Sequence, residues 1–451
     1  MFQNQDTICA LATPNGVGAI GVIRLSGSNS FEAVSAVFSK KLAGLNSHTT
    51  HFGTISSKEG ELIDEVLVAV FQDGKSFTGE ESVEISCHGS SYIQQKIITS
   101  LIESGCRMAN PGEFTQRAFL NGKMDLSQAE AVADLIASES KRAHDIALKQ
   151  LRGKLSSELR ELREKLINFA SLVELELDFA EEDVEFADRT ELKKLVTDVL
   201  AYIRRLAKSF ELGNAIKNGV PVAIVGAPNT GKSTLLNQLL GDDRAIVSNI
   251  EGTTRDVIEE TLNIEGILFR LIDTAGIREG AEEVEAMGIE RSLEKIKQAT
   301  IVLCLADGSK EGNIQHVSSW TKELKERHPE KKVLMVLNKI DIAPTEVESA
   351  IHISAKQGDN IKLLEQRLVS EVQGDFNLGN ETIVSNARHY EALIKTADAL
   401  EKADFGLDSG VTGDFVAMDI RQAMFHLGSI TGDISTDDLL GNIFSKFCIG
   451  K

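Results

Sequence analysis

Residues 226–233 read GAPNTGKS, a match to the phosphate-binding loop pattern GxxxxGK[ST]. A strand-like run, Val222–Val225, precedes this loop, and a helical run, Thr234–Leu240, follows it, which is the context that the pattern requires. In such a loop the backbone N–H groups surround phosphates, the lysine brings positive charge to the outer phosphates, and the serine hydroxyl binds Mg²⁺. We therefore expect nucleotide contacts from Gly226, Asn229, Thr230, Gly231, Lys232, Ser233 and Thr234, with Ser233 as a magnesium ligand.

Two later motifs predict which base this site takes. The sequence Asn338-Lys339-Ile340-Asp341 follows the strand-like run Val333–Leu337, and Ser354-Ala355-Lys356 follows Ala350–Ile353. A carboxylate at Asp341 accepts two hydrogen bonds from the N1–H and the exocyclic amine of guanine, a donor pair that adenine lacks. The predicted substrate is therefore GTP rather than ATP, and the residues expected at the base are Asn338, Lys339, Asp341, Ser354 and Ala355.

Two segments have the positions of nucleotide-sensing switches. In Gly252-Thr253-Thr254-Arg255-Asp256 a threonine hydroxyl is expected to complete the magnesium shell. Asp273-Thr274-Ala275-Gly276 follows the strand-like run Ile267–Ile272 and places a carboxylate near Mg²⁺ and a glycine amide near the γ-phosphate. The expected contacts here are Ser248, Asn249, Ile250, Glu251, Gly252, Thr253, Thr254, Asp273, Thr274, Ala275 and Gly276, with Thr254 as a second magnesium ligand.

The catalytic group is less evident than the binding residues. Ile277 stands where Ras-type GTPases carry the glutamine that orients water, and an isoleucine cannot hydrogen-bond to water. Hydrolysis must therefore take this group from elsewhere. Arg278 is a catalytic candidate because it lies in the same segment, although nothing in the sequence directs it inward. Acidic candidates follow, which the residues alone do not rank: Glu279, Glu282, Glu283 and Glu285.

Composition limits the class of protein. A chain of 451 residues is long enough for roughly two to four domains. The formal net charge of −20 opposes strong non-specific binding to nucleic acid, so an RNA substrate would need a local basic patch or a basic partner. The 5 cysteines form no CxxC pair, which argues against disulfides and a zinc site. Because no apolar run approaches the roughly 18 residues of a membrane span and the N-terminus lacks a signal-peptide pattern, we expect a cytoplasmic protein without membrane contact.

The pattern along the chain predicts a multidomain protein that combines α/β and all-α folds. Residues 1–120 are expected to form an α+β N-terminal domain. Residues 121–218 and 375–451 are expected to form the two parts of one helical domain. Between them, strand-like and helical runs alternate over residues 219–374, which predicts an inserted Ras-like P-loop domain with a mainly parallel sheet.

Several elements are predicted individually. Strands are expected at Ala19–Leu25, Val66–Phe71 and Val83–Ser86. Ser127 and Glu130 have capping-box spacing at the start of a helix whose apolar residues recur from Val132 to Ala147. Helical character is expected over Leu155–Leu177, Leu192–Leu212, Glu391–Ala403 and Phe415–Leu427, with an acidic interruption at Glu181–Glu185.

The two switch motifs and the C-terminal sequence Phe447-Cys448-Ile449-Gly450-Lys451 resemble those of the bacterial tRNA-modification GTPases called MnmE or TrmE. One departure is His88-Gly89-Ser90, where many relatives have His-Gly-Gly. The resemblance covers the whole chain and includes Ala12-Thr13-Pro14, Ser76-Phe77-Thr78-Gly79-Glu80, Pro111-Gly112-Glu113-Phe114 and Phe119-Leu120-Asn121-Gly122-Lys123-Met124-Asp125-Leu126.

This resemblance implies a potassium-activated GTPase that forms a homodimer and works with a flavoprotein of the MnmG (GidA) family, which carries the FAD. Together such proteins add an aminomethyl-type group, commonly carboxymethylaminomethyl, to carbon 5 of the wobble uridine of certain tRNAs. The tRNA is expected to be presented through the partner. The N-terminal domain is implied to support dimerisation and to bind a folate of the 5-formyltetrahydrofolate type as the one-carbon source.

Carried onto this sequence, the resemblance implies specific residues. The folate contacts are Arg24, Glu84, Lys123 and Lys451, and basic groups with one carboxylate suit the glutamate tail and the pterin edge of a folate. Cys448 is implied in tRNA modification but not in GTP hydrolysis, and Glu285 is implied as the general base or water-positioning residue. The implied potassium ligands are Asn229, Ser248, Ile250 and Thr253, and the neutral side-chain oxygen of Asn229 suits a monovalent cation.

Two other interpretations stay open on the sequence alone. A ribosome-maturation GTPase would be expected to carry a basic RNA-binding module, whereas this chain is strongly acidic. A folate-dependent aminomethyl transferase with a merely structural nucleotide domain would show near-zero GTP turnover under every cation condition. GTP turnover and the modification state of tRNA distinguish the three.

Overall fold

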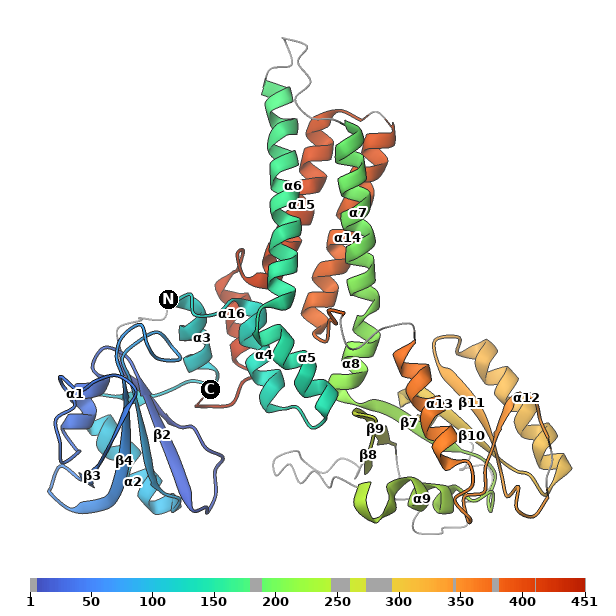
Figure 1. Ribbon diagram of the computed structural model, residues 1–451, viewed down its shortest axis with the longest axis horizontal. Helices are drawn as coiled ribbons and strands as arrows, with labels where there is room; N and C mark the ends of the chain where they lie inside the picture. The colour runs from blue at the N-terminus through green and yellow to red at the C-terminus, as the bar shows by residue number, and fades with distance from the viewer. Residues whose placement is uncertain are drawn as a thin grey trace. The chain divides into compact units, whose positions relative to one another are not determined.

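The computed structural model describes residues 6–178, 189–244, 260–272, 294–343, 346–374, 381–409 and 411–450. The chain forms two compact units, whose elements are labelled in Figure 1. The first unit comprises Met1–Ala133, Gln150–Asn168 and Met424–Lys451, and the second comprises Asp134–Lys149 and Phe169–Ala423. Each unit contains one sheet of 6 described strands.

The sheet of the first unit has the order β3-β4-β5-β2-β1-β6, and only the β1–β6 pair is parallel. One face packs against helices α1 (Ser30–Ser35) and α2 (Ser91–Glu103), so buried apolar residues alternate with more exposed residues along the strands. The strands are β1 (Ile8–Leu11), β2 (Ile20–Ser26), β3 (Thr49–Ser56), β4 (Leu62–Phe71), β5 (Ser82–His88) and β6 (Arg107–Met108). The expected strands therefore fall on β2, β4 and β5.

The sheet of the second unit has the order β12-β11-β10-β7-β9-β8 and is parallel except for the β8–β9 hairpin. This confirms the predicted Ras-like arrangement. The strands are β7 (Val220–Val225), β8 (Glu260–Ile264), β9 (Ile267–Leu271), β10 (Ile301–Asp307), β11 (Lys332–Asn338) and β12 (Ala350–His352).

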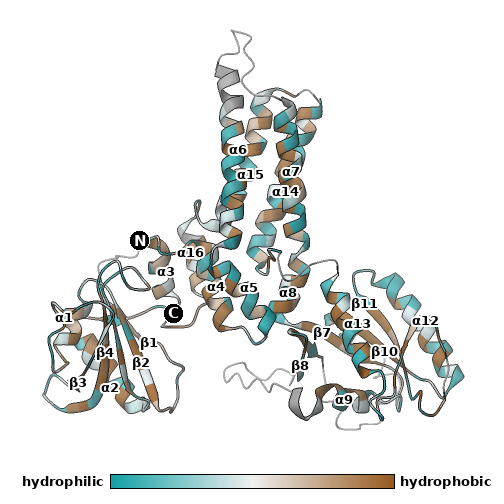
Figure 2. Cartoon of the chain, viewed as in Figure 1, coloured by the Kyte–Doolittle hydropathy of each residue, from teal (hydrophilic) through white to brown (hydrophobic). Residues whose placement is uncertain are grey.

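Helices cover both faces of this second sheet, which explains why the whole of β10 is buried. Ile301, Leu303 and Leu305 join a core with α8 (Phe210–Asn218), α9 (Lys232–Arg244) and α13 (Ile361–Gln373). The alternating residues Val302, Cys304 and Ala306 join the core with α12 (Glu311–Arg327) on the opposite face. Figure 2 accordingly shows these central strands as mainly hydrophobic.

The remaining described helices are α3 (Glu113–Leu120), α4 (Leu126–Ile136), α5 (Lys141–Leu151), α6 (Lys154–Asp178), α7 (Arg189–Lys208), α14 (Ala387–Ser409), α15 (Gly413–Thr431) and α16 (Asp437–Phe444). Helices α7 and α14 pack together and are joined by the ion pairs Arg204–Glu401, at 2.6 Å, and Lys193–Asp408. Figure 2 shows both hydrophilic and hydrophobic residues along these long helices. None of the helices in the described ranges is long and apolar enough to cross a membrane.

The structure corrects the predicted helix start near residue 127. Helix α4 begins at Leu126, and the capping box consists of Asp125 and Gln128 rather than Ser127 and Glu130. The Gln128 N–H donates to the Asp125 carboxylate, and the Asp125 N–H donates to the Gln128 side chain, both at 2.9 Å. Ser127 lies inside the helix, where its backbone carbonyl and hydroxyl accept from the Gln150 amide.

Two helices that the periodicity predicts as continuous are each divided at a serine. Residues 137–140 separate α4 from α5, because the Ser140 hydroxyl accepts from the N–H of Ala143 and caps the new helix. Ser209 separates α7 from α8, and its hydroxyl donates to the carbonyl of Leu206 and accepts from the N–H of Val384. The remaining expected helices lie on α6, α14 and α15, while the acidic interruption at Glu181–Glu185 lies outside the described residues.

Candidate functional site

The predicted phosphate loop connects the carboxyl end of β7 to the start of α9, at the centre of the second sheet. Gly231 has a φ of 96°, and a Cβ there would collide with the side-chain amide of Asn338. Gly226 also has a positive φ, and its Cβ would lie 2.5 Å from the carbonyl oxygen of Leu305. Both positions therefore require glycine, so the loop backbone can pass close to the neighbouring strands.

Lys232, Ser233 and Thr234 stand in the first turn of α9, where helix N–H groups attract an anion. The Lys232 ammonium lies over the loop and donates to the carbonyls of Gly226 and Ala227, at 2.9 and 3.0 Å. The loop backbone, the lysine charge and the helix start suit a chain of phosphates. Ser233 and Thr234 are exposed, as a Mg²⁺ ligand on this turn must be.

Asn338 connects three of the predicted loops. This residue is 3% exposed and ends β11. Its side-chain amide donates to the carbonyl of Thr230 at 2.9 Å, and its side-chain oxygen accepts from the N–H of Ala355 at 2.9 Å. The phosphate loop, the Asn338 motif and the Ser354 motif are thus held together by one buried side chain.

The residues expected at the base also lie together. The Ser354 hydroxyl donates to the Asp341 carboxylate at 2.7 Å, and the hydroxyl also accepts from the N–H of Gln357 at 3.2 Å. Asp341 itself is exposed, whereas Ser354 is buried. This arrangement orients an accessible carboxylate, which is what recognition of the two guanine donors requires.

Sequence reasoning missed one residue of this site. Asp307 ends β10, and its buried carboxylate accepts a hydrogen bond of 2.7 Å from the Lys339 ammonium. Lys339 also donates to the carbonyl of Asn229 at 2.8 Å. The only sequence signal was a polar residue followed by Gly308-Ser309 at the end of an apolar strand, a pattern shared by many turns.

Some candidates in the nucleotide site fall outside the described ranges. These are Ser248, Asn249, Ile250, Glu251, Gly252, Thr253, Thr254, Asp273, Thr274, Ala275, Gly276, Arg278 and Glu285. Their expected roles stay predictions.

A second group of candidates lies in the first unit. Arg24 of β2 and Glu84 of β5 are directly opposite in the antiparallel register, and the Arg24 guanidinium donates to Glu84 at 2.9 Å. The guanidinium carbon also lies 5.7 Å from the ring centroid of Phe77 and 5.8 Å from that of Phe114. A cation, a carboxylate and the partly exposed Phe77 ring therefore share one place on the sheet.

Lys123 reaches the loop that carries Phe77. Its ammonium donates to the carbonyl of Gly74 at 2.6 Å, and the amide of Asn121 donates to the carbonyl of Thr78 at 2.8 Å. Gly79 has a φ of 81°, and a Cβ there would lie 3.1 Å from the Lys123 side chain. The loop between β4 and β5 thus brings Lys123 and Arg24, which are far apart in sequence, to one segment.

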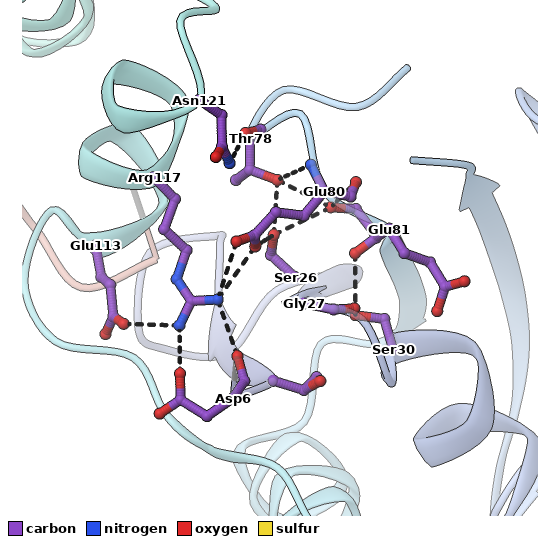
Figure 3. Close-up of polar contacts among 12 residues, drawn as sticks. Asp6, Ser26, Gly27, Ser30, Thr78, Glu80, Glu81, Glu113, Arg117 and Asn121 are labelled. Atoms are coloured by element: carbon purple, nitrogen blue, oxygen red, sulfur yellow. Dashed lines mark hydrogen bonds and ion pairs between the residues drawn. The ribbon is translucent and has the colours of Figure 1, made fainter. Parts of the chain in front are cut away.

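A buried ion-pair network fixes this loop (Figure 3). The Arg117 side chain of α3 is 3% exposed and pairs with Asp6, Glu80 and Glu113 at 2.8, 3.1 and 3.0 Å. Glu80 also accepts from the Ser26 hydroxyl at 2.7 Å, next to the end of β2. Burial raises the pKa of Glu113, but hydrogen bonds from Arg107, the Asn110 N–H and Arg117 outweigh it and hold that pKa below its usual range.

The C-terminal tail lies against the same sheet. The N–H of Gly112, just before α3, donates to the carbonyl of Cys448 at 3.3 Å. Gly450 has a φ of 94°, and a Cβ there would collide with the carbonyl oxygen of Leu11 in β1. Cys448 is exposed, while Cys9, Cys87, Cys106 and Cys304 are buried and free. Lys451 lies outside the described residues.

Comparison with known proteins decides the family. The family description "MnmE helical domain" matches residues 126–448, and "GTP-binding protein TrmE N-terminus" matches residues 7–123. A protein of Cytophaga hutchinsonii named tRNA modification GTPase MnmE is 55% identical, over 100% of this chain and 98% of that protein. The chain belongs to the MnmE family of tRNA modification GTPases. MnmE of Flavobacterium johnsoniae is 52% identical over 99% of this chain and 100% of its own.

As a member of the MnmE family, the chain is a GTP hydrolase that acts in tRNA modification. Among solved structures, "Era in complex with MgGDPNP and nucleotides 1506-1542 of 16S ribosomal RNA" is 27% identical over 40% of this chain and 65% of that chain, with a TM-score of 0.25. The assignment rests on the full-length MnmE relatives. Since the match extends over the whole chain and includes the TrmE N-terminal family at residues 7–123, MnmE membership is favoured over a ribosome-maturation factor.

Proposed function

We propose that this chain is a potassium-activated GTPase that works with a flavin-containing MnmG-type partner in the cytoplasm. The pair adds an aminomethyl-type group, commonly carboxymethylaminomethyl, to carbon 5 of the wobble uridine of certain tRNAs. The carbon comes from a tetrahydrofolate derivative held by the N-terminal unit. The flavin belongs to the partner.

One observation supports the proposal beyond GTP hydrolysis: the tail with Cys448 contacts the unit whose sheet carries Arg24 and Glu84. The Cys448 carbonyl accepts from Gly112, two residues before Phe114, and the Arg24 guanidinium lies 5.8 Å from the Phe114 ring centroid. The Cys448 thiol is exposed, and its unit also carries the Arg24–Glu84 pair, which suits group transfer better than a purely structural role. A nucleotide hydrolase alone has no use for such a group in another unit.

The residues of the first unit fit a folate in chemistry. The glutamate tail of a folate is anionic, and Arg24 and Lys123 are cations that face one loop. Glu84 is a carboxylate suited to the N–H edge of a pterin, and Phe77 offers a partly exposed ring. When bound, the folate supplies a one-carbon unit, while these side chains bind and orient it.

The residues of the second unit fit GTP, Mg²⁺ and a monovalent cation. Ser233 offers a hydroxyl for Mg²⁺ on the first turn of α9, and Thr254 is its proposed companion. Asn229 is exposed within the phosphate loop, where its side-chain oxygen is a proposed K⁺ ligand together with Ser248, Ile250 and Thr253. The proposed catalytic acid is Glu285, and Arg278 is kept as a candidate.

The proposed assembly is a homodimer that receives tRNA through the flavoprotein. The net charge of −20 supports this route, because an acidic chain repels a phosphate backbone unless a basic partner presents it. Sedimentation of the chain with and without the partner and tRNA tests the assembly. Direct, tight tRNA binding by the chain alone would contradict it.

The deciding experiment is mass analysis of the wobble uridine in cells whose chromosomal gene is deleted and which carry the unmodified or a variant gene on a plasmid. The unmodified chain is expected to restore the modified uridine. Cys448→Ser is expected to leave GTP turnover within about twofold and to abolish the modified uridine. Ser445→Ala, at the exposed C-cap of α16 just before the tail, is the control. A fully modified tRNA pool in the Cys448→Ser strain would show that the Cys448 thiol has no role in the modification.

A further inference from the structure

Asp307 is placed where the phosphate loop and the base loop meet. It ends β10 and lies opposite Asn338 of β11 in the parallel register. Its side chain is 4% exposed, and both carboxylate oxygens are used. One oxygen accepts from the N–H and the hydroxyl of Ser309, at 3.0 and 2.6 Å, and the other accepts from the Lys339 ammonium at 2.7 Å.

The contacts of Asp307 favour its charged form. Burial raises the pKa of Asp307, but the hydrogen bonds from Lys339 and Ser309 outweigh burial and bring that pKa below its usual range. A buried carboxylate needs a cation in good geometry, because desolvation of an unpaired charge is costly. Lys339 supplies that cation, so the direction of its side chain is set by Asp307.

Lys339 connects Asp307 with the phosphate loop. Its ammonium also donates to the backbone carbonyl of Asn229 at 2.8 Å. Both residues have left-handed backbone conformations, with φ of 69° at Lys339 and 61° at Asn229. Asparagine adopts this conformation readily, whereas for lysine it is uncommon and persists only where the surroundings hold it. The contacts of Lys339 with Asp307 and Asn229 supply such a restraint at Lys339.

We propose that Asp307 is a positioning residue of the guanine-nucleotide site: it holds Lys339 against the phosphate loop and so fixes the phosphate loop and the base loop together. The same restraint sets the position of Asp341, two residues after Lys339. A site that is ordered before the ligand arrives loses less conformational entropy on binding, so Asp307 contributes to affinity without touching the nucleotide.

The alternative role for Asp307 is that of a turn former. Its contacts with Ser309 close the turn that follows β10, and they use only one carboxylate oxygen. Two substitutions separate the roles. Asp307→Asn keeps an oxygen for the turn and removes the charge that holds Lys339. Ser309→Ala removes the hydroxyl contact of the turn and keeps the ion pair.

The test is equilibrium titration of the full chain with fluorescent GTP and ITP analogues. ITP lacks the exocyclic amine, so the ratio of the two affinities reports on the placement of Asp341. Asp307→Asn is expected to weaken GTP binding by about tenfold or more and to reduce the GTP-to-ITP ratio. Ser309→Ala is expected to stay within about threefold of the unmodified chain. Equal GTP affinity for Asp307→Asn and the unmodified chain would overturn the proposal.

A double-mutant cycle with Lys339→Met tests whether Asp307 acts through Lys339. The combined variant is expected to bind GTP about as weakly as the weaker single variant, because each change breaks the same contact. The combined variant can also be measured if Asp307→Asn alone does not fold, because the combined variant leaves neither the carboxylate nor the ammonium unpaired. The emission of Trp320, the only tryptophan, reports whether the second unit is folded. Additive effects of the two substitutions would show that Asp307 acts independently of Lys339 and would reject the proposal.

Discussion

At the base site, Ser354 orients Asp341 through a hydrogen bond of 2.7 Å before any base arrives. Asp341→Asn replaces one acceptor oxygen by an amine that faces a guanine donor. We expect GTP affinity to fall by more than about tenfold and xanthosine triphosphate affinity to rise, as measured by nucleotide titration. Asp359→Asn, an exposed acid in the loop that carries Ser354, is the control. Unchanged GTP affinity would show that Asn338–Asp341 do not bind the base.

Single residues differ in how far a sequence can predict them. The glycines, Lys232 and Asp341 are marked by motifs, because their chemistry needs fixed spacing over a few positions. The residues that position them are not. Asp307 and Lys339 are 32 positions apart, and Arg117 and Asp6 are 111 positions apart. Such ion pairs are made by the fold, so a pattern of neighbouring residues does not contain them.

The boundaries of elements show a related limit. Asp125–Gln128 and Ser127–Glu130 both have the spacing of a capping box, and the contacts of the folded chain select the first pair. Periodicity predicts helical character through residues 137–140, but the Ser140 hydroxyl caps a new helix there. Element types were therefore predictable, whereas the ends depended on competing local hydrogen bonds.

The loop between β4 and β5 is the element that we expect to govern folate binding. Arg117→Met removes the cation that Glu80 and Glu113 share, although Glu113 keeps its pair with Arg107. Loss of one partner costs about 3–5 kcal/mol in comparable buried pairs. We expect faster hydrogen exchange at Thr78 and weaker 5-formyltetrahydrofolate binding by calorimetry. GTP turnover should be unchanged, since the nucleotide loops lie in the other unit. The Trp320 unfolding transition should not move for the same reason.

The same network predicts an acid dependence with a definite sign. The pKa values of Glu113 and Asp6 lie below their usual ranges, so the ionised carboxylates stabilise the fold at pH values above those ranges. This stabilisation is lost as pH falls through the lowered values. The stability difference between the unmodified chain and Arg117→Met should therefore shrink from pH 6 toward pH 3.

A milder variant for the folate-binding test, Asn121→Ala, removes only the hydrogen bond to Thr78. The exposed Gln95→Ala on α2 is its control. Folate binding unaffected by both Arg117→Met and Asn121→Ala would show that the network has no part in it.

On the scale of the whole molecule, the proposed function joins two units with different chemistry. The nucleotide loops belong to the second unit, and Arg24, Glu84 and Cys448 belong to the first. Motifs at strand ends predicted the nucleotide residues, whereas the family resemblance implied Arg24, Glu84 and Cys448. Coupling between GTP hydrolysis and tRNA modification could not be predicted in the same way, because a motif of neighbouring residues carries no information on how distant parts of a chain affect one another.

Hydrolysis in the second unit needs a positive charge beside the β–γ bridge, a role that an arginine finger fills in many GTPases at a gain of roughly 10³–10⁵ in rate. Asn229 is exposed in the phosphate loop, and its backbone carbonyl is already engaged by Lys339 at 2.8 Å. Its side-chain oxygen is therefore the proposed K⁺ ligand, and a bound K⁺ would supply the charge. GTP turnover is expected to be at least about tenfold faster in K⁺ than in Na⁺ at equal ionic strength.

Asn229→Ala should erase the difference between the two salts, but Asn229 has a φ of 61°, where alanine is strained. Asn229→Gly removes the same oxygen without that strain, because glycine tolerates a positive φ. Loss of the K⁺ preference in both variants would identify the oxygen as the cause, whereas loss in the alanine variant alone would identify backbone strain. Equal rates in K⁺ and Na⁺ for the unmodified chain would end the potassium mechanism.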